Sequence, residues 1–595
     1  MSPAFTAFLQ ASLISLSFFF ATASRSEYSA ILSPGTPSTE ILENVAKFPD
    51  IYCEWAVNEK VAMEVVIGAS FAGARSLTAM KHVGMNVALD PLMTFAYVGA
   101  NGGMVIVSAD DPGMHSSQNE QDNRYLAKFA KIPMLEPSDS QECHDMTLAA
   151  LTMSEEFATP VLLRTTTRIS HSSGVVDLGV FERKAPTGRV YEKDITRTVM
   201  VPMYARKMRL VLEDKLARLA EHSETSPFHI IERGNSIGII TSGVGYQYAR
   251  EAFPEASILR LGMTFPLPKN MIREFAASVE RLYIVEEGEP YLEEQILAMG
   301  VRIEQPKTNL RIGELNPERL EELACEIMGT TYPAKPAPMD DLPARPPVLC
   351  PSCGHRGVYY ALNRLKATVT GDIGCYSLGA FAPLSSMDTI ICMGASVGTA
   401  HGMQKAGHAN RTAAIIGDST FFHSGITGLL NVIYNRGTST IIVLDNRTTA
   451  MTGHQEHPGT GRTLMGQETV ETQVEDVAKG LGVKRVRVID PYDLEETYNV
   501  LKEELDSDEP SVVVAKRPCV LGRMFKVARQ FEICDEACKA CGLCLKIGCP
   551  GMEVTETDPK TGRPSKIHIN SVLCAGCGMC VQVCKSDAIK EKTLQ

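Results

Sequence analysis

Apolar and polar positions follow three successive blocks along the chain, and each block predicts strands that alternate with helices. In the first block, residues 31–225, the runs "MVIVSADD" (104–111) and "TPVLLRTTT" (159–167) are apolar, rich in β-branched residues and bounded by turns, which predicts buried strands. The stretch "NEKVAMEVVIGASFAGARSLTAM" (58–80) has the small and apolar residues of closely packed helices. The second block, residues 226–330, contains the strand-like runs "SIGIITSGVG" and "RLYIVEEGEP". This alternation favours parallel α/β sheets.

The rest of the chain divides at a proline-rich stretch. Residues 331–347 include "YPAKPAPMDDLPARPP", which predicts an extended linker. A third α/β block follows over residues 348–525, and residues 526–595 hold most of the cysteines. Since 595 residues exceed what one hydrophobic core supports, we expect a multidomain α/β protein with a small C-terminal α+β domain.

Charge and cysteine content narrow the class of function. The net charge is −12 and the isoelectric point is about 5.7, which argues against a nucleic-acid-binding protein. Eight of the 17 cysteines lie between Cys538 and Cys584. In so long a chain, that density indicates metal or cluster ligation and a reducing compartment rather than a disulfide framework.

The C-terminal cysteines form two runs that are typical of a two-cluster bacterial ferredoxin. The spacing assigns Cys538, Cys541, Cys544 and Cys584 to a first [4Fe–4S] cluster, and Cys574, Cys577, Cys580 and Cys549 to a second one. Paired zinc sites are the alternative, but zinc rarely uses a triple step of cysteines at this spacing. The first run has four residues before its last cysteine instead of three, Lys585 stands where proline is usual, and Cys534 has no place in the pattern.

A Gly-Asp turn and a later Asn follow two predicted parallel strands of the third block. Asp418 and Asn446 lie at the carboxyl ends of these strands, the edge where open α/β sheets bind ligands. With the backbone carbonyl of Thr448, they are suitable ligands for Mg²⁺ and a diphosphate. The helix that begins after Gly417, with Ser419 in its first turn, would face the anion. The pattern resembles the thiamine diphosphate motif; an Asp that only caps a helix is the alternative.

A thiamine diphosphate site also needs a Glu from a separate domain, which hydrogen-bonds the aminopyrimidine ring. We identify Glu59 as this catalytic candidate because it precedes a helix of small residues that a ring could approach closely. Glu64 is the alternative candidate. The alternative interpretation of Glu59 is a surface residue at the start of a helix, without a catalytic role.

The order of these blocks resembles the indolepyruvate branch of the 2-oxoacid:ferredoxin oxidoreductase family. The similarity covers residues 32–590 and includes "SPGTPSTEILE", "DDPGMHSSQNEQDNR", "EEGEPYLEEQ", "GDIGCYSLG", "MGASVGTAHGM", "GDSTFFHSG" and "LDNRTTAMTGHQEHPG". The resemblance implies a pyrimidine-binding domain (31–225), a transketolase C-terminal-like domain (226–330), a diphosphate-binding domain (348–525) and a ferredoxin domain (526–595). It also implies that Thr36 lies near the substrate carboxylate.

The resemblance implies oxidative decarboxylation of aryl 2-oxoacids with coenzyme A, giving arylacetyl-CoA and CO₂, with electrons passing through [4Fe–4S] clusters to ferredoxin. It also implies a smaller β subunit in a heterodimer or α2β2 assembly. Three alternatives stay open: a sister enzyme for pyruvate, 2-oxoglutarate or a branched-chain oxoacid, a non-oxidative thiamine decarboxylase, and a plain electron-transfer subunit. The eight clustered cysteines oppose the second, and the Asp418–Asn446 pair opposes the third.

A further set of cysteines lies outside the ferredoxin region. Some relatives in the superfamily hold a third [4Fe–4S] cluster with a pattern that Cys350, Cys353, Cys375 and Cys519 match. The alternative is a set of structural thiols. His355 is assigned as a cofactor-binding residue near the diphosphate rather than as a metal ligand.

The N-terminal segment, residues 1–30, departs from the family. It has no charge from Pro3 to Ser24, and "LISLSFFFATAS" resembles the apolar core of a signal peptide, although no Lys or Arg precedes it. An export signal or anchor, a buried first helix or strand, and an atypical or mis-assigned start are the three interpretations. An enzyme with this many cofactors is hard to assemble outside the cytoplasm. We therefore favour an atypical start over export, and expect a cytoplasmic protein without stable membrane insertion.

Overall fold

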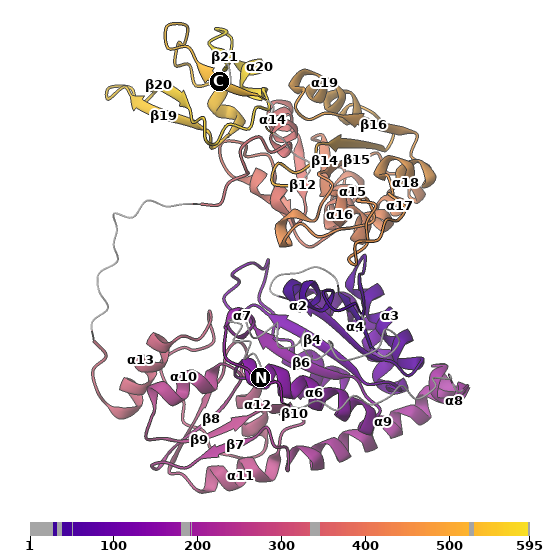
Figure 1. Cartoon of the computed structure of the whole chain (residues 1–595), viewed down its shortest axis with the longest axis vertical. Coiled ribbons are helices and arrows are strands. Elements are labelled where there is room, and N and C mark those ends of the chain that lie inside the picture. The colour runs from indigo at the N-terminus through magenta and orange to yellow at the C-terminus, as the bar shows by residue number, and fades with distance from the viewer. Residues whose placement is uncertain are drawn as a thin grey trace, which may run out of the picture. The chain divides into compact units, whose positions relative to one another are not determined.

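The computed structural model describes residues 28–32, 38–49, 51–179, 191, 193–333, 346–522, 527 and 529–592. The chain divides into two compact units, residues 1–338 and 339–595 (Figure 1). Thr36, the apolar segment before residue 28 and most of the proline-rich stretch lie outside the described residues. Within the described parts of the chain, no helix is both long enough and apolar enough to cross a membrane.

Unit 1 begins with a seven-stranded sheet in the order β10-β5-β6-β4-β3-β1-β2. Its strands are parallel except β10, and they are β1 (Tyr28–Leu32), β2 (Tyr52–Trp55), β3 (Arg75–Lys81), β4 (Met104–Asp110), β5 (Met134–Leu135), β6 (Val161–Thr166) and β10 (Met263–Phe265). The accompanying helices are α2 (Thr39–Val45), α3 (Glu59–Phe71), α4 (His82–Val98), α5 (Arg124–Ala130), α6 (Ser140–Phe157), α7 (Thr167–His171), α8 (Ile195–Thr198) and α9 (Pro202–Ser223).

The structure confirms the strands predicted from the apolar runs and corrects one expected helix. Every residue of β4 and β6 is buried, because the central strands of this sheet are covered on both faces. Residues 58–80, however, are not all helical: α3 ends at Phe71, and the chain enters β3 at Arg75. Since β3 is buried on both faces, its sequence lacks the alternation that marks a half-exposed strand, and pairing with β1 and β4 decides its conformation.

A second, four-stranded sheet of unit 1 has the order β11-β8-β9-β7. Its elements are β7 (Ile230–Glu232), β8 (Ile237–Ser242), α10 (Gly245–Ala252), β9 (Ser257–Leu261), α11 (Lys269–Ala277), β11 (Arg281–Val285), α12 (Tyr291–Ala298) and α13 (Pro317–Met328). β10 leaves this region and pairs antiparallel with β5 of the first sheet. One hydrophobic core includes residues of both sheets, so the two regions fold against each other.

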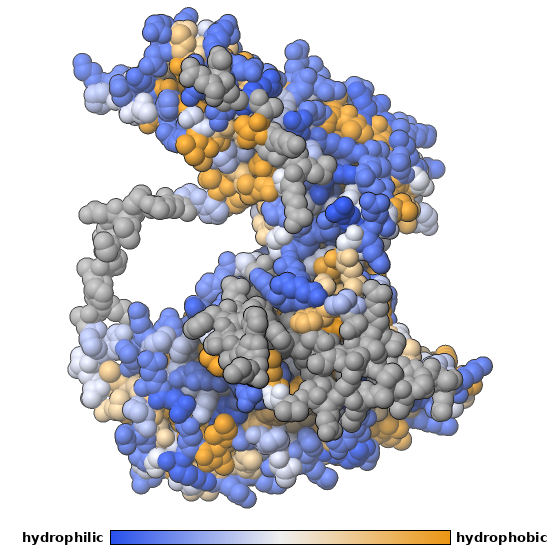
Figure 2. Space-filling model, viewed as in Figure 1, coloured by the Kyte–Doolittle hydropathy of each residue, from blue (hydrophilic) through white to orange (hydrophobic). Residues whose placement is uncertain are grey.

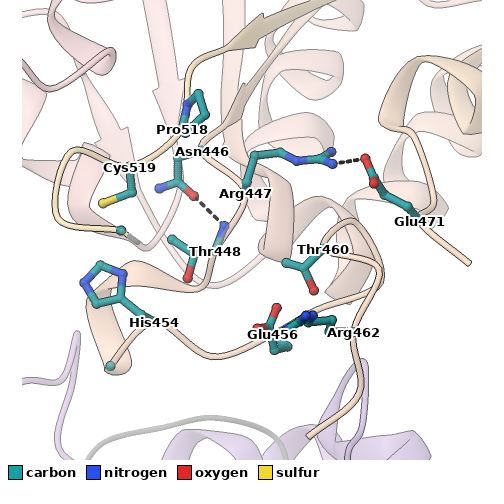
Figure 3. A pocket seen from close by; sticks show the side chains of 12 residues that line it. Asn446, Arg447, Thr448, His454, Glu456, Thr460, Arg462, Glu471, Pro518 and Cys519 are labelled. Atoms are coloured by element: carbon teal, nitrogen blue, oxygen red, sulfur yellow. Dashed lines mark hydrogen bonds and ion pairs between the residues drawn. The ribbon is translucent and has the colours of Figure 1, made fainter. Parts of the chain in front are cut away.

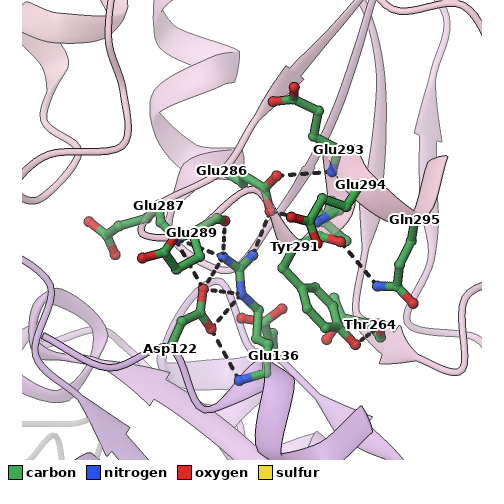
Figure 4. Close-up of polar contacts among 12 residues, drawn as sticks. Asp122, Glu136, Thr264, Glu286, Glu287, Glu289, Tyr291, Glu293, Glu294 and Gln295 are labelled. Carbon is green, nitrogen blue, oxygen red and sulfur yellow. Dashed lines mark hydrogen bonds and ion pairs between the residues drawn. The ribbon is translucent and has the colours of Figure 1, made fainter. Parts of the chain in front are cut away.

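A buried ion network around Arg124 of α5 joins the two regions of unit 1. Figure 4 shows its acidic members, Asp122 and Glu286. The guanidinium donates to the Glu286 carboxylate at 2.8 Å and to the backbone carbonyls of Glu287 and Glu289 at 2.8 and 2.9 Å. Asp122 accepts from Arg124 Nε at 2.9 Å. Because Arg124 is 1% exposed, its charge depends on these partners for stabilisation.

Unit 2 contains a parallel six-stranded sheet in the order β13-β12-β14-β15-β17-β16. The strands are β12 (Thr368–Gly371), β13 (Thr389–Ile390), β14 (Thr412–Gly417), β15 (Thr440–Asp445), β16 (Arg485–Ile489) and β17 (Ser511–Lys516). The helical segments are α14 (His355–Leu365), η1 (Cys375–Ala380), α15 (Ala395–Lys405), α16 (Asp418–Thr420), η2 (Phe421–Gly425), α17 (Ile426–Tyr434), η3 (Ala450–Thr452), α18 (Val474–Gly480) and α19 (Leu494–Leu505).

The cysteine-rich end of the chain forms a small α+β region within unit 2. It contains two antiparallel strand pairs, β18 (Gln530–Ile533) with β21 (Ile589–Lys592), and β19 (Met552–Thr557) with β20 (Pro564–Ile569). The short helices η4 (Cys544–Ile547) and α20 (Met579–Val583) carry cysteines, and both α14 and η4 lie at its contact with the parallel sheet domain. The α/β fold class is therefore as predicted.

The visible surface of each unit is mostly hydrophilic, with scattered hydrophobic patches (Figure 2). This agrees with the content of charged residues, which make up 22% of the chain.

Candidate functional site

The predicted diphosphate site lies where β14 and β15 end side by side. These strands pair in parallel, with Gly417 opposite Leu444, so Asp418 and Asn446 follow adjacent strand ends. The backbone N–H of Arg447 donates to Asp418 Oδ2 at 2.8 Å and ties the two loops together. The structure thus brings Asp418 and Asn446 to one edge of the sheet, the edge at which such sheets bind ligands.

Asp418 is a buried carboxylate held in one orientation. Oδ1 accepts from the backbone N–H of Ser419 at 2.8 Å, and His457 Nε2 lies 3.2 Å from Oδ2. Burial by itself would raise the pKa of Asp418, but the His457 imidazole and these hydrogen bonds hold that pKa below its usual value. Burial and the Asp418 charge raise the pKa of neighbouring Asp445 to about 6. Asp418 is therefore the ionised member of the pair, as a cation ligand must be.

A pocket of about 520 Å³ opens beside these loops (Figure 3). It is lined by Asn446, Arg447, Thr448, Gly453, His454, Glu456, Thr460, Arg462, Glu471, Pro518, Cys519 and Gly522. Figure 3 shows Arg447 directed at Glu471, with which it forms an ion pair. Asn446 Oδ1 accepts from the backbone N–H of Thr448 at 3.1 Å, which holds the amide in the loop. The lining supplies both oxygen ligands for a cation and basic groups for an anion.

Two aromatic rings lie behind the Gly-Asp turn. The ring of His355, at the start of α14, meets Tyr376 edge to face with centroids 6.0 Å apart. A side chain at Gly417 would lie 2.7 Å from Tyr376 Cε1, so this approach requires glycine. Burial lowers the pKa of His355 to about 4, so this imidazole is neutral near pH 7. Ser419 accepts a hydrogen bond from Thr449 at 2.9 Å, so its hydroxyl also faces the β15 loop.

The candidate catalytic Glu lies in unit 1, at the first position of α3. Asn58 caps the helix by accepting from the Val61 N–H at 2.9 Å. Glu59 is 7% exposed and packs on α4, where a side chain at Gly84 would lie 2.7 Å from Glu59 Cγ. The alternative, Glu64, is exposed and pairs with Lys60. Of the two candidates, only Glu59 has the buried position that contact with a cofactor ring requires.

The four thiols assigned to the second cluster surround one small void. This void of about 30 Å³ is lined by Ser352, Phe531, Ile547, Cys549, Gly551, Met552, Ile569, Cys574, Gly576, Cys577, Gly578 and Cys580. Burial, followed by the charges of Cys577, Cys549 and Cys574, raises the pKa of Cys580 to about 12. Cysteine side chains gathered around one cavity fit an iron–sulfur cluster, whose irons bind and stabilise their thiolate forms.

The first set of thiols is also gathered, nearer to the surface. Burial, and then the charges of Cys538, Cys541 and Cys584, raise the pKa of Cys544 to about 11. Cys541 is exposed. Cys534 donates to Glu536 at 3.0 Å, an interaction outside this set.

The thiols of the third set meet beside the diphosphate edge. Burial, and then the charges of Cys519 and Cys350, raise the pKa of Cys375 to about 11. Burial is likewise the main reason why the pKa of Cys353 rises to about 12, with Cys350 and Cys375 contributing. Cys519 also lines the pocket next to Asn446. The fold thus brings together cysteines that are far apart in sequence.

A site for a single metal ion requires side chains that converge on one point, which a cluster does not. Among the residues that the structure describes, no group of three or more His, Cys, Asp or Glu side chains converges so as to hold one metal ion. A [4Fe–4S] cluster does not require such convergence, since each of its four cysteines binds a different iron. The thiol sets fit clusters, and the Asp418 edge offers one carboxylate with amide and carbonyl oxygens.

Several residues of these sites are not distinguished by the sequence patterns. His457 contacts Asp418 although it is 39 positions further along the chain, and its only signal is its place in the segment "HQEHPG". Ser352 and Arg356, which belong to the sheet domain, contact the second cluster's loops. Their adjacency to Cys350 and Cys353 is the only local signal.

Comparisons with protein families match three segments of the chain. Residues 29–233 match the pyruvate flavodoxin/ferredoxin oxidoreductase thiamine diphosphate-binding family. Residues 372–515 match the C-terminal thiamine pyrophosphate-binding domain of thiamine pyrophosphate enzymes, and residues 567–590 match the 4Fe-4S binding domain.

Whole-length relatives are also found. The chain is 41% identical to indolepyruvate oxidoreductase subunit IorA of Pyrococcus abyssi, over 94% of this chain and 93% of that protein. It is 39% identical to the subunit of the same name from Archaeoglobus fulgidus, with the same coverage. A solved 2-oxoglutarate:ferredoxin oxidoreductase from Magnetococcus marinus matches 53% of this chain and 63% of that chain at 18% identity, with a TM-score of 0.42.

Proposed function

Because the chain belongs to the indolepyruvate oxidoreductase subunit IorA family of thiamine diphosphate-dependent 2-oxoacid:ferredoxin oxidoreductases, we propose that it oxidatively decarboxylates aryl 2-oxoacids such as indolepyruvate. The products are arylacetyl-CoA, CO₂ and reduced ferredoxin. The single observation that carries the proposal is that unit 2 holds the Asp418–Asn446 edge and the gathered cysteine sets together. A non-oxidative decarboxylase has no use for the second of these features.

Each proposed role follows from the position of a side chain. Asp418, Asn446 and the Thr448 carbonyl hold Mg²⁺ and the diphosphate, with Gly417 and Ser419 shaping the turn. Bound thiamine diphosphate supplies the electron sink for decarboxylation. Neutral His355 contributes a dipole rather than a charge beside the Gly-Asp turn. Such a group can orient the cofactor without competing with Mg²⁺ for the diphosphate.

Two proposed catalytic roles lie in unit 1. Glu59 orients the aminopyrimidine ring from its buried position at the start of α3. Thr36, outside the described residues, contacts the substrate carboxylate, and this role remains a prediction.

The cysteine sets give the electrons their route to ferredoxin. We infer two clusters in the ferredoxin region and a third held by Cys350, Cys353, Cys375 and Cys519, which lies beside the diphosphate edge. A centre at that place shortens the distance over which electrons leave the cofactor. A smaller partner subunit, coenzyme A and ferredoxin complete the proposed reaction.

The test is a dye-reduction assay on the anaerobically co-purified complex with the smaller subunit. Indolepyruvate and phenylpyruvate are compared with pyruvate, 2-oxoglutarate and a branched-chain oxoacid, each with and without coenzyme A. We expect reduction that depends on coenzyme A and is fastest with the aryl substrates. Absence of oxoacid-dependent reduction would refute the proposal, and preference for another oxoacid would replace its substrate.

Two measurements test the assigned residues. Glu59→Gln is expected to lower kcat by at least about 100-fold, the usual contribution of a positioned proton-transfer group, while the matched Glu64→Gln is expected to leave it unchanged. Iron analysis is expected to give about twelve iron atoms per chain, because each of the three clusters contains four irons. A value near eight would remove the third cluster.

A further inference from the structure

A buried arginine links the Cys350–Cys353 loop to the ferredoxin region. Arg356, in the first turn of α14, is 1% exposed, and its guanidinium donates only to backbone carbonyls among its described hydrogen bonds. On its own side it bonds the carbonyls of Leu349 and Cys350, the latter at 3.2 Å from Nε. Across the contact it bonds the carbonyls of Ile547, at 3.3 Å, and Gly548.

Ile547 and Gly548 immediately precede Cys549, one of the four thiols around the second cluster's void. The carbonyls neutralise none of the arginine's charge, since they carry only partial charges. The guanidinium lies within electrostatic range of the Cys549 and Cys577 thiols on one side, and of Cys350 and Cys353 on the other. Buried arginines usually pair with carboxylates, so this charge lacks its usual partner in the described structure. An anionic cluster bound by Cys549 and its three companions would supply one.

Ser352 approaches the same void from the same loop. It is 3% exposed and lines the void with the four thiols, where its hydroxyl opposes the rise that burial causes in the pKa of the Cys577 thiol. Its backbone has a φ of 58°, a left-handed conformation that is unfavourable for a non-glycine residue. The hydroxyl of Tyr492 donates to the Ser352 carbonyl and holds the loop in this conformation.

A second contact fixes the ferredoxin region on the same face. Gln582, on α20 between Cys580 and Cys584, donates to the Tyr492 carbonyl at 2.7 Å and accepts from the Leu494 N–H at 3.0 Å. The second cluster's loops are therefore the side of the ferredoxin region that is attached to the sheet domain, while Cys541 of the first set is exposed.

We propose that Arg356 and Ser352 are positioning residues for electron transfer, which hold the second cluster against the Cys350–Cys353 loop and raise its reduction potential above that of the first cluster. The inference rests on the proposed function for the presence of the clusters. Reduction takes the cluster from [4Fe–4S]²⁺ to [4Fe–4S]⁺ by one electron, with no bond made or broken. A fixed positive charge in a buried place favours the added negative charge, and a hydrogen bond to a cysteine sulfur acts in the same direction.

The test is an EPR-monitored reductive titration of the purified full chain, in which dithionite supplies the electrons. Arg356→Met removes the buried charge, and Lys546→Met is the matched control because it removes an exposed charge from the neighbouring turn. We expect Arg356→Met to lower the equilibrium constant for reduction of the second cluster at least tenfold, about 59 mV for one electron. The control is expected to shift it several-fold less. Cys580→Ser, which alters a ligand of the second cluster alone, identifies its signal.

Two further variants separate charge from packing. Arg356→Lys retains the charge, so the reduction potential of its second cluster is expected to stay close to that of the wild type. Ser352→Ala is expected to lower this potential with the iron content unchanged. If Arg356→Met does not retain its iron, Ser352→Ala decides the result. The inference is overturned if Ser352→Ala, and Arg356→Met where it retains its iron, leave the potential unchanged, or if Lys546→Met shifts it as much as Arg356→Met does.

The readout distinguishes this inference from the proposed function. The titration needs no oxoacid, coenzyme A or partner subunit, so its outcome is independent of the decarboxylation chemistry. If the Arg356→Met and Ser352→Ala variants show the expected shifts in potential but the complex shows no oxoacid-dependent dye reduction, only the proposed function is refuted. If the first and second clusters of the wild-type ferredoxin region are both present but have equal reduction potentials, only the inference is refuted.

Discussion

Replacement of Arg124 by Met tests whether the buried ion network holds the two regions of unit 1 together. The substitution removes a charge that is 1% exposed, leaves the Glu286 carboxylate without its arginine and leaves Asp122 with only the more distant Arg164, at 3.6 Å. The carbonyls of Glu287 and Glu289 lose a donor at the same time. Breaking a buried pair from one side typically costs about 3–5 kcal/mol, so we expect a loss in this range.

The chain provides its own probe and its own control for this measurement. Its single tryptophan, Trp55, lies on β2 of unit 1, so guanidinium unfolding followed by tryptophan fluorescence reports on that unit. The matched control is Arg311→Met, which removes an arginine paired with Glu293 at 2.8 Å but 51% exposed. An exposed pair contributes about 0–1 kcal/mol, so the control is expected to lose no more than that.

A double substitution completes the test. Arg124→Met combined with Glu286→Gln removes both charges of one pair, so its cost is expected to be smaller than the sum of the single costs. A loss below about 1 kcal/mol for Arg124→Met, or strict additivity in the double variant, would show that the network contributes little and that apolar packing joins the two regions.

Three further outcomes are expected. Asp418→Asn keeps the shape of the Gly-Asp turn but removes its charge, so affinity for Mg²⁺ and thiamine diphosphate, measured calorimetrically, should fall at least tenfold; unchanged affinity would exclude the site. Burial lowers the pKa of His229 to about 4, so its folded state resists protonation, and stability should be lost as the pH falls from about 6.5 towards 4. Wild-type protein should lose about 3 kcal/mol more over that window than His229→Gln in fluorescence-monitored unfolding, and parallel curves would contradict this. Gly357→Ala would place its Cβ 1.8 Å from the Pro491 carbonyl oxygen, so it should destabilise unit 2 by at least about 1–3 kcal/mol in calorimetry; a wild-type melting temperature would contradict this.

The diphosphate edge shows how far local patterns reach. β14 and β15 are continuous apolar runs that end in Gly-Asp and Asp-Asn, and both their conformation and the edge they share follow from strand period and parallel pairing. His457 could not be placed in the same way, because its approach to Asp418 depends on how the loop after β15 folds back. The expected helix over residues 58–80 failed at Arg75 for a related reason: sheet pairing, which is not local, overrode a composition that favours helix.

The sequence by itself determined the features that depend on near neighbours: the buried strands, the Gly-Asp turn, and the spacing that divides eight cysteines into two sets. The tertiary structure decided the features that depend on distant segments. It inserted β10 into a sheet that begins more than 200 residues earlier, and it brought Cys350, Cys375 and Cys519 close to one another. It also placed Arg356 against the carbonyl of Ile547. The separation of residues along the chain explains this division. Local patterns predict contacts between near neighbours, whereas a contact between remote residues depends on how all the intervening helices and strands pack.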